Sequence, residues 1–196
     1  MQIIEGFLKG TMVPYKEQKW TRVTSEKVRK AVFDVLKGFV DFEDLKVADL
    51  FCGSGMYGLE AMSRGAKEVV FVDEDKGVAK TLKENLKKLK VESYKVENRK
   101  VENFIVHYGS TQEHGANSFD LVFADPPYYD FDFAKLNDVY KILNDPSSPR
   151  LRRTSGIFVL EQSKRGGAKE LKGLELFLEK KYGDTSVRFY RTMSNI

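Results

Sequence analysis

The chain is poor in the residues that build disulfide frameworks and metal sites. It has one cysteine, Cys52, and two histidines in 196 residues. A single cysteine excludes an internal disulfide framework, and no set of Cys and His has zinc-site spacing, so we expect no metal. No apolar run approaches the roughly 18 residues that a membrane-spanning helix needs. The start of the chain also lacks a charged segment followed by an apolar block. We therefore expect a cytoplasmic protein without a membrane partner.

The excess of basic over acidic residues is also small, but it is unevenly distributed along the chain. The net charge is +4, from 33 basic and 29 acidic residues. Residues 1–36 carry seven basic and four acidic side chains, and residues 150–169 carry six basic and one acidic. Clustered Lys and Arg suit a polyanion, because they displace its condensed counterions. Solvated surface lysines are the alternative explanation of the same pattern.

Apolar runs alternate with helical patterns along most of the chain, which is typical of a parallel sheet. The expected strands are residues 46–51, 68–72, 93–96, 119–124 and 156–160, and the expected helices are 56–64, 77–89 and 133–143. An earlier helix has Val28, Val32 and Leu36 on one stripe, with Thr24 or Ser25 as its N-cap. Two alternating runs around a Tyr-Gly-Asp turn predict a C-terminal antiparallel hairpin.

These elements predict the α/β class: a doubly wound, mostly parallel seven-stranded sheet that ends in the antiparallel hairpin. A small N-terminal arm of short strands plus one helix precedes it. We expect a division into an N-terminal arm with the first helix, 1–40, and the sheet domain, 41–196.

The glycine-rich segment ADLFCGSGMYG, residues 48–58, follows the first strand of the sheet. Gly53, Gly55 and Gly58 have the spacing G-x-G-x-x-G, and Asp73 lies 20 positions after Gly53, at the end of the second strand. Such a turn brings backbone N–H groups close to a ligand, and the carboxylate can bind both hydroxyls of a ribose. The pattern suits a nicotinamide dinucleotide and S-adenosylmethionine alike.

Asp49 favours the second of these ligands. Its carboxylate lies near the turn, where it would repel a pyrophosphate and attract the amine of S-adenosylmethionine. A core carboxyl paired with backbone donors is the alternative. Cys52, beside the turn, has no paired base or second cysteine, so we expect a small buried residue and not a nucleophile.

The segment FADPPYYD, residues 123–130, follows the fourth strand and carries the most specific chemistry. Two prolines after a buried strand fix the chain in a rigid turn without N–H donors. The Asp125 carboxylate and the Pro126 carbonyl can then accept hydrogen bonds from an exocyclic amine of a nucleobase and expose its lone pair. Tyr128 would stack on that base.

Taken together, the motifs resemble a known family. GFLKG, TRVTSEKVRKAVFDVL, DLFCGSGMYGLEAMSRGAKEVVFVDED, DPPY, LEQSK and KKYGDTSVRFYR are similar, in this order, to the bacterial 16S ribosomal RNA guanine-N2 methyltransferases. The resemblance implies a Rossmann-like class I methyltransferase fold with S-adenosylmethionine as cofactor. It also implies 16S ribosomal RNA or the 30S subunit as partner, and we expect a monomer.

The resemblance also implies roles for individual residues. The expected catalytic residues are Asp125, Pro126, Pro127 and Tyr128. The expected cofactor-binding residues are Asp49, Phe51, Cys52, Gly53, Ser54, Gly55, Asp73 and Asp125. The expected RNA-binding residues are Lys9, Gly10, Arg22, Thr24 and Arg29.

The chain departs from the family pattern at two places. Val23 replaces the usual proline before the first helix, and no acidic residue clearly follows the third strand, where Asn98 and Lys100 lie. Adenine contacts are accordingly unassigned. The rival functions are a DNA or RNA adenine-N6 methyltransferase, a non-catalytic assembly factor that binds the cofactor or RNA, and a dinucleotide oxidoreductase.

Overall fold

The structure, a computed structural model, describes six ranges of the chain: residues 1–15, 25–110, 118–127, 131–144, 156–163 and 170–193. Three of the residues expected to bind or react, Arg22, Thr24 and Tyr128, lie outside these ranges.

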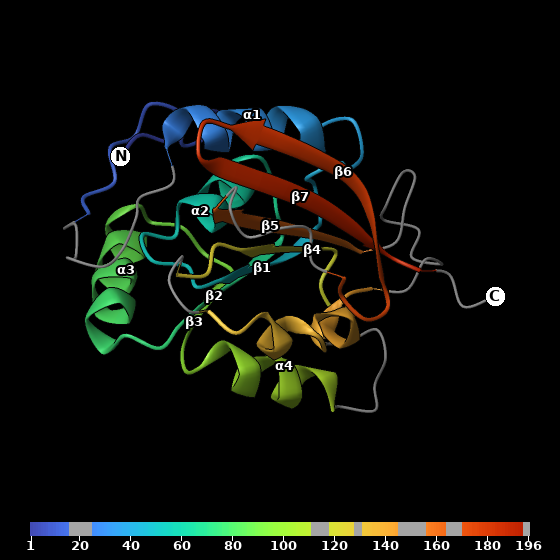
Figure 1. Cartoon of the computed structure of the whole chain (residues 1–196). Helices are drawn as coiled ribbons and strands as arrows, with labels where there is room; N and C mark the ends of the chain where they lie inside the picture. Colours follow the sequence, from blue (N-terminus) through green and yellow to red (C-terminus); the bar gives the residue numbers. More distant parts are fainter. Residues whose placement is uncertain (16–24, 111–117, 128–130, 145–155, 164–169, 194–196) are drawn as a thin grey trace.

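A seven-stranded sheet with the order β3-β2-β1-β4-β5-β7-β6 runs through the centre of the molecule (Figure 1). Its strands are β1 (Lys46–Leu50), β2 (Glu68–Asp73), β3 (Tyr94–Asn98), β4 (Leu121–Ala124), β5 (Ile157–Ser163), β6 (Leu174–Tyr182) and β7 (Thr185–Thr192). β1 to β5 are parallel, whereas β7 is antiparallel to both β5 and β6. The predicted α/β class and the C-terminal hairpin are confirmed.

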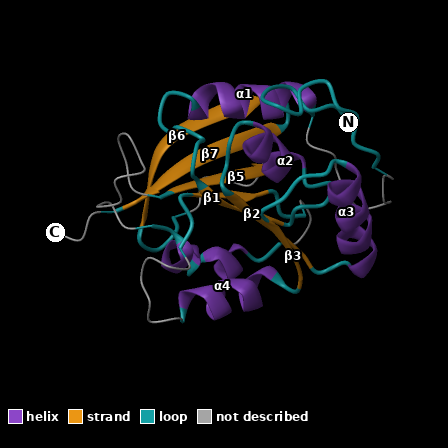
Figure 2. Cartoon of the chain, turned by 180° about the vertical axis from the view of Figure 1, so that it is seen from behind, coloured by secondary structure: helices purple, strands orange, loops and turns teal. Residues whose placement is uncertain are grey.

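Helices cover both faces of this sheet, as its doubly wound connectivity requires (Figures 1 and 2). One face carries α1 (Glu26–Leu36), α2 (Met56–Ser63) and α3 (Lys76–Lys88); the other carries α4 (Val101–Gly109) and the 3₁₀ turns η1 (Phe133–Leu136) and η2 (Val139–Ile142). Within the described ranges, no helix combines the length and apolar character needed to cross a bilayer.

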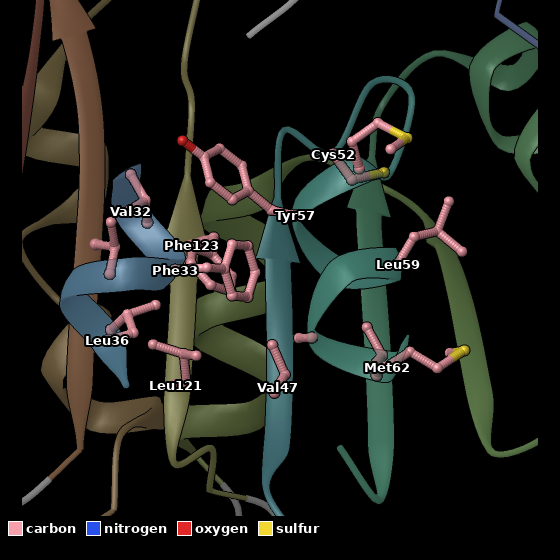
Figure 3. Packing of buried hydrophobic residues seen from close by; sticks show 14 of the residues in the cluster. Val32, Phe33, Leu36, Val47, Cys52, Tyr57, Leu59, Met62, Leu121 and Phe123 are labelled. Atoms are coloured by element: carbon pink, nitrogen blue, oxygen red, sulfur yellow. The ribbon is translucent and has the colours of Figure 1, made fainter. Parts of the chain in front are cut away.

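The first helix is built as its sequence predicts. The Ser25 hydroxyl caps α1 by accepting a hydrogen bond from the Val28 backbone N–H at 3.2 Å. The buried face of α1 packs against residues of β1, β4 and α2 in one continuous apolar cluster (Figure 3). α1 therefore shares its core with the sheet, while the expected division at residue 40 stays a prediction.

Two segments on the sheet face opposite α1 differ from what the sequence predicts. No helix was expected after the third strand, yet α4 lies there and buries Val101, Phe104 and Ile105. The single helix expected over 133–143 is wrong, because the structure has two separate 3₁₀ turns there, η1 and η2. Asn137 and Asp138 lie between them, and such residues compete with helical hydrogen bonds and favour caps and turns.

The N-terminal residues form a small hairpin that is fixed to the end of α2. Gln2 and Met12 pair in an antiparallel bridge, and Ile3 and Val13 are buried. At the tip, the Phe7 N–H donates to the Ser63 carbonyl at 2.8 Å. The Leu8 N–H donates to the Ser63 hydroxyl at 2.9 Å. The backbone of the tip is thus held by α2, while Phe7 and Lys9 are exposed.

Candidate active site

The glycine turn lies at the carboxyl edge of the sheet, between β1 and α2. The backbone is left-handed at Gly53 (φ 50°) and at Gly55 (φ 72°), which glycine adopts without strain. A Cβ at Gly58 would lie 2.3 Å from the Phe71 ring, and one at Gly55 would lie 2.7 Å from Leu82. A Cβ at Gly53 would meet nothing closer than 3.9 Å. Gly55 and Gly58 therefore serve packing, whereas the space at Gly53 is open to a ligand.

Asp73 at the end of β2 is directed at this turn. One carboxylate oxygen accepts from the Gly53 N–H at 3.0 Å, and the other accepts from the Asp75 N–H at 2.9 Å. Partial burial raises the pKa of Asp73, and the charges of Asp75 and Glu74 add to this effect. Asn98, opposite Asp73 on β3, donates to the backbone carbonyls of Asp73 and Glu74 at 3.0 and 2.9 Å. The structure thus brings together the glycine turn and the carboxylate expected to bind a ribose.

Asp49 lies beneath the same turn and is 3% exposed. Its carboxylate accepts a hydrogen bond from the Gly58 N–H at 2.9 Å. Burial raises the pKa of Asp49 to about 8, and the charge of Asp73 contributes in the same direction. The structure therefore shows the backbone-paired core carboxyl that the sequence allowed, while a contact with a ligand amine stays a prediction.

This raised pKa predicts a pH-dependent effect of Asp49→Asn on stability. Between the ordinary value of 3.8 and about 8, folded Asp49 holds a proton that the unfolded chain has released. The wild type therefore loses stability relative to the variant as pH rises through this window. We expect the difference in unfolding free energy to change by about 3 to 4 kcal/mol between pH 5 and pH 8 in favour of the Asp49→Asn variant, as measured by urea titrations. Glu84→Gln, on the exposed face of α3, is the matched acid-to-amide substitution for the same titrations.

Asp125 comes directly after β4, at the edge where the glycine turn lies. Ala124 is in register with Leu50 of β1 and with Leu160 of β5, so the chain segments that follow these strands are neighbours. Asp125 is half-buried, Pro126 is buried and Pro127 is exposed. The structure therefore places Asp125 and the glycine turn at adjacent strand ends, as predicted.

Tyr57 and Glu161 are the buried polar pair that sequence reasoning missed. The Tyr57 hydroxyl donates to the Glu161 carboxylate at 2.7 Å, and the Tyr57 ring stacks on Phe123 with centroids 4.8 Å apart (Figure 3). Burial, followed by the charges of Glu161 and Asp125, raises the pKa of Tyr57 well above its ordinary range, so the phenol keeps its proton. The available sequence signal was Glu161, a charged residue directly after the apolar run 156–160.

The remaining turn residues are Phe51, Cys52 and Ser54, and their contacts with a cofactor stay a prediction. Cys52 is buried, and burial raises the pKa of its thiol well above the usual range, so it is no thiolate nucleophile. The Phe51 ring packs edge-on against Phe131, with centroids 5.1 Å apart. Ser54 is half-buried in the turn. In the parts of the chain that the structure describes, no cluster of three or more His, Cys, Asp or Glu could hold a metal ion.

The expected RNA-binding residues separate into two groups. Lys9 and Gly10 are exposed on the N-terminal hairpin, as a phosphate contact requires. Arg29 is 1% exposed, pairs with Glu60 at 3.2 Å and donates to the Gln2 carbonyl at 2.6 Å. The expectation of a phosphate contact at Arg29 is therefore corrected, because its guanidinium is committed to an internal ion pair.

Comparisons with known proteins agree with this geometry. The family profile described as "Conserved hypothetical protein 95" matches residues 1–191. The chain is 30% identical to the Bacillus subtilis protein YlbH over 192 residues, 97% of this chain and 98% of that one. It is 35% identical to ribosomal RNA small subunit methyltransferase D of Haemophilus influenzae over 130 residues, 66% of this chain and 64% of that one.

Solved structures show the same fold over the full length. The Escherichia coli protein YhhF superposes with a TM-score of 0.81 at 24% identity, covering 100% of this chain and 99% of that one. The Haemophilus influenzae protein HI0767 superposes with a TM-score of 0.71 at 27% identity, covering 98% of both chains. The fold is that of class I methyltransferases. The chain therefore belongs to the Conserved hypothetical protein 95 family, the family of the small-subunit ribosomal RNA methyltransferase D enzymes.

Proposed function

We propose that this S-adenosylmethionine-dependent methyltransferase modifies the exocyclic N2 of one guanine in small-subunit ribosomal RNA. The observation that carries the proposal is the position of Asp125-Pro126, which follows β4 at the edge where the glycine turn follows β1. The Haemophilus influenzae relative, named a ribosomal RNA small subunit methyltransferase, supports RNA of this class as the substrate.

The residues at the carboxyl edge fit a nucleoside that carries a sulfonium and an amine. The open space at Gly53 allows the ligand to approach the backbone, and the Asp73 carboxylate lies beside it for the ribose hydroxyls. Asp49, beneath the turn, would be the partner of the amine. When bound, S-adenosylmethionine supplies a methyl group on a positively charged sulfur.

Asp125 and Pro126 act on the acceptor nitrogen. The two oxygens accept its N–H hydrogens and hold the lone pair toward the methyl carbon. Transfer would form a nitrogen–carbon bond as the carbon–sulfur bond breaks, leaving an uncharged thioether. It would place the positive charge on the nitrogen until one N–H proton passes to solvent or to Asp125. Catalysis comes from positioning and from negative groups close to the developing charge. Tyr128, whose structure is not described, would stack on the base.

A methylation assay with three substrates tests the function. The protein is incubated with labelled methyl donor and with small subunits, free ribosomal RNA or DNA from cells that lack the gene. We expect label in ribosomal RNA alone, and mass spectrometry of the digested RNA should place it on guanine N2. Label on adenine N6 or in DNA would overturn the proposal, and the absence of transfer to all three would favour a binding role.

The N-terminal hairpin offers a surface for the RNA. Phe7 is 69% exposed at its tip, close in sequence to exposed Lys9. Glu5, the only acidic residue of the hairpin, pairs with Lys37 at 2.7 Å and also with Arg64. An exposed aromatic ring with a cationic neighbour on an anchored backbone suits stacking on an unpaired base.

Phe7→Ala is expected to weaken RNA binding about tenfold, because stacking of one base on an aromatic ring contributes about 1.4 kcal/mol. Fluorescence anisotropy with a labelled ribosomal RNA fragment measures the affinity. Phe7→Trp should restore it. Val106→Ala is the matched control, because Val106 is 64% exposed on α4, on the opposite face of the sheet (Figure 1). Equal affinities for the alanine variants at positions 7 and 106 would contradict the role of Phe7.

A further inference from the structure

The Tyr57–Glu161 pair lies next to the proposed reaction centre. Leu160 of β5 is in register with Ala124 of β4. Glu161 and Asp125 are the next residues on these two chain segments, so they are neighbours. Neighbouring strands are about 4.8 Å apart. Glu161 is 3% exposed, so it is too deeply buried to contact the RNA itself. Any influence on the reaction must pass through the protein that surrounds it.

Tyr57, on α2, holds the Glu161 carboxylate in place by a hydrogen bond. Its hydroxyl donates at 2.7 Å, and its ring is stacked between α2 and β4 on Phe123, two residues before Asp125. The charges of Glu161 and Asp125 both act on this hydroxyl. The phenol therefore lies near carboxyl groups of β5 and of the segment after β4, at the edge where the substrate would bind.

We propose that Glu161, held in place by the Tyr57 hydroxyl, is a positioning residue for methyl transfer that stabilises the positive charge developing on the acceptor nitrogen. The inference rests on the proposed function. During transfer, the charge moves from sulfur to nitrogen, toward the strand ends where Asp125 and Glu161 lie. If Glu161 is ionised, its fixed negative charge in a buried, weakly screened environment stabilises that state more than the state before transfer. Glu161 acts through its electric field and does not contact the substrate.

The test compares Glu161→Gln, Tyr57→Phe and the double variant in single-turnover methyl transfer at saturating donor and RNA. Glu161→Gln keeps the shape of the side chain and removes its charge, and we expect the rate to fall by about tenfold or more. The dissociation constants of S-adenosylhomocysteine and of the RNA should change by less than about twofold. Tyr57→Phe should lower the rate less, and the double variant should match Glu161→Gln, because Tyr57 acts through Glu161.

Two controls make the result decisive. Glu175→Gln, at an exposed ion pair on β6, should leave the rate unchanged. Thermal unfolding confirms that each variant is folded at the assay temperature. A wild-type rate for Glu161→Gln, or a loss explained by weaker donor or RNA binding, overturns the inference. If Glu161→Gln does not fold, a wild-type rate for Tyr57→Phe overturns it.

The activity of Asp125→Ala shows whether a negative result concerns only the role of Glu161 or also the proposed function. If Asp125→Ala is inactive while Glu161→Gln and Tyr57→Phe are fully active, only the inference is wrong. If Asp125→Ala is active as well, the proposed reaction centre is wrong together with it.

Discussion

Asp125→Ala is expected to lower kcat by about a hundredfold or more, the loss typical of a positioned electrostatic group. The carboxylate accepts a hydrogen from the target amine and offsets the charge that develops there. If Asp125 acts on the acceptor alone, donor affinity should change by less than about twofold, whereas a larger loss would mean that it also binds the cofactor, as the resemblance implies. Methyl transfer from labelled donor measures kcat, and calorimetry with S-adenosylhomocysteine measures the affinity.

Two further variants show whether the effect belongs to the carboxylate. Asp125→Asn keeps one oxygen acceptor and loses the charge, so we expect intermediate activity. Asp132→Ala removes the exposed carboxylate that caps η1, a turn on the same connection, and should retain nearly full activity. Normal turnover by Asp125→Ala would show that the reaction centre lies elsewhere.

Local patterns were sufficient to predict most of the fold. Runs such as 46–51 and 68–72 are mostly apolar because a central parallel strand is buried on both faces. The observed strands, β1 (Lys46–Leu50) and β2 (Glu68–Asp73), end within one residue of these runs. The glycines and Asp73 could be placed at one edge because the carboxyl ends of parallel strands coincide. The helix α4 carried a readable signal, since Val101, Phe104 and Ile105 have helical spacing and are its buried residues.

The features that could not be predicted depend on partners far apart in the chain. Tyr57 and Glu161 are 104 residues apart, and nothing local indicates that one donates to the other. Arg29 and Glu60 are separated by 31 residues, so Arg29 appeared to belong to a basic surface when it is internal. The insertion of β7 between β5 and β6 is equally non-local.

The Arg29–Glu60 pair should also account for a large part of the stability. Glu60 is fully buried, and its carboxylate accepts from the Arg29 side chain at 3.2 Å and from the Ile4 N–H at 2.6 Å. Arg29 in turn donates to the Gln2 carbonyl, so the pair fastens the N-terminal hairpin to α1 and α2. Breaking a buried pair by removing one partner leaves an uncompensated charge.

Glu60→Ala is therefore expected to lower the free energy of unfolding by about 3 to 5 kcal/mol. Asp34→Ala is the matched control. It breaks an exposed ion pair with Lys30, with side chains 47% and 62% exposed, and should cost less than about 1 kcal/mol. Urea unfolding measures both. Replacing the pair together, as Arg29→Met with Glu60→Leu, should recover much of the loss because no buried charge is then left without its partner. If Glu60→Ala were no more destabilising than Asp34→Ala, the ion pair would not be what fastens the hairpin.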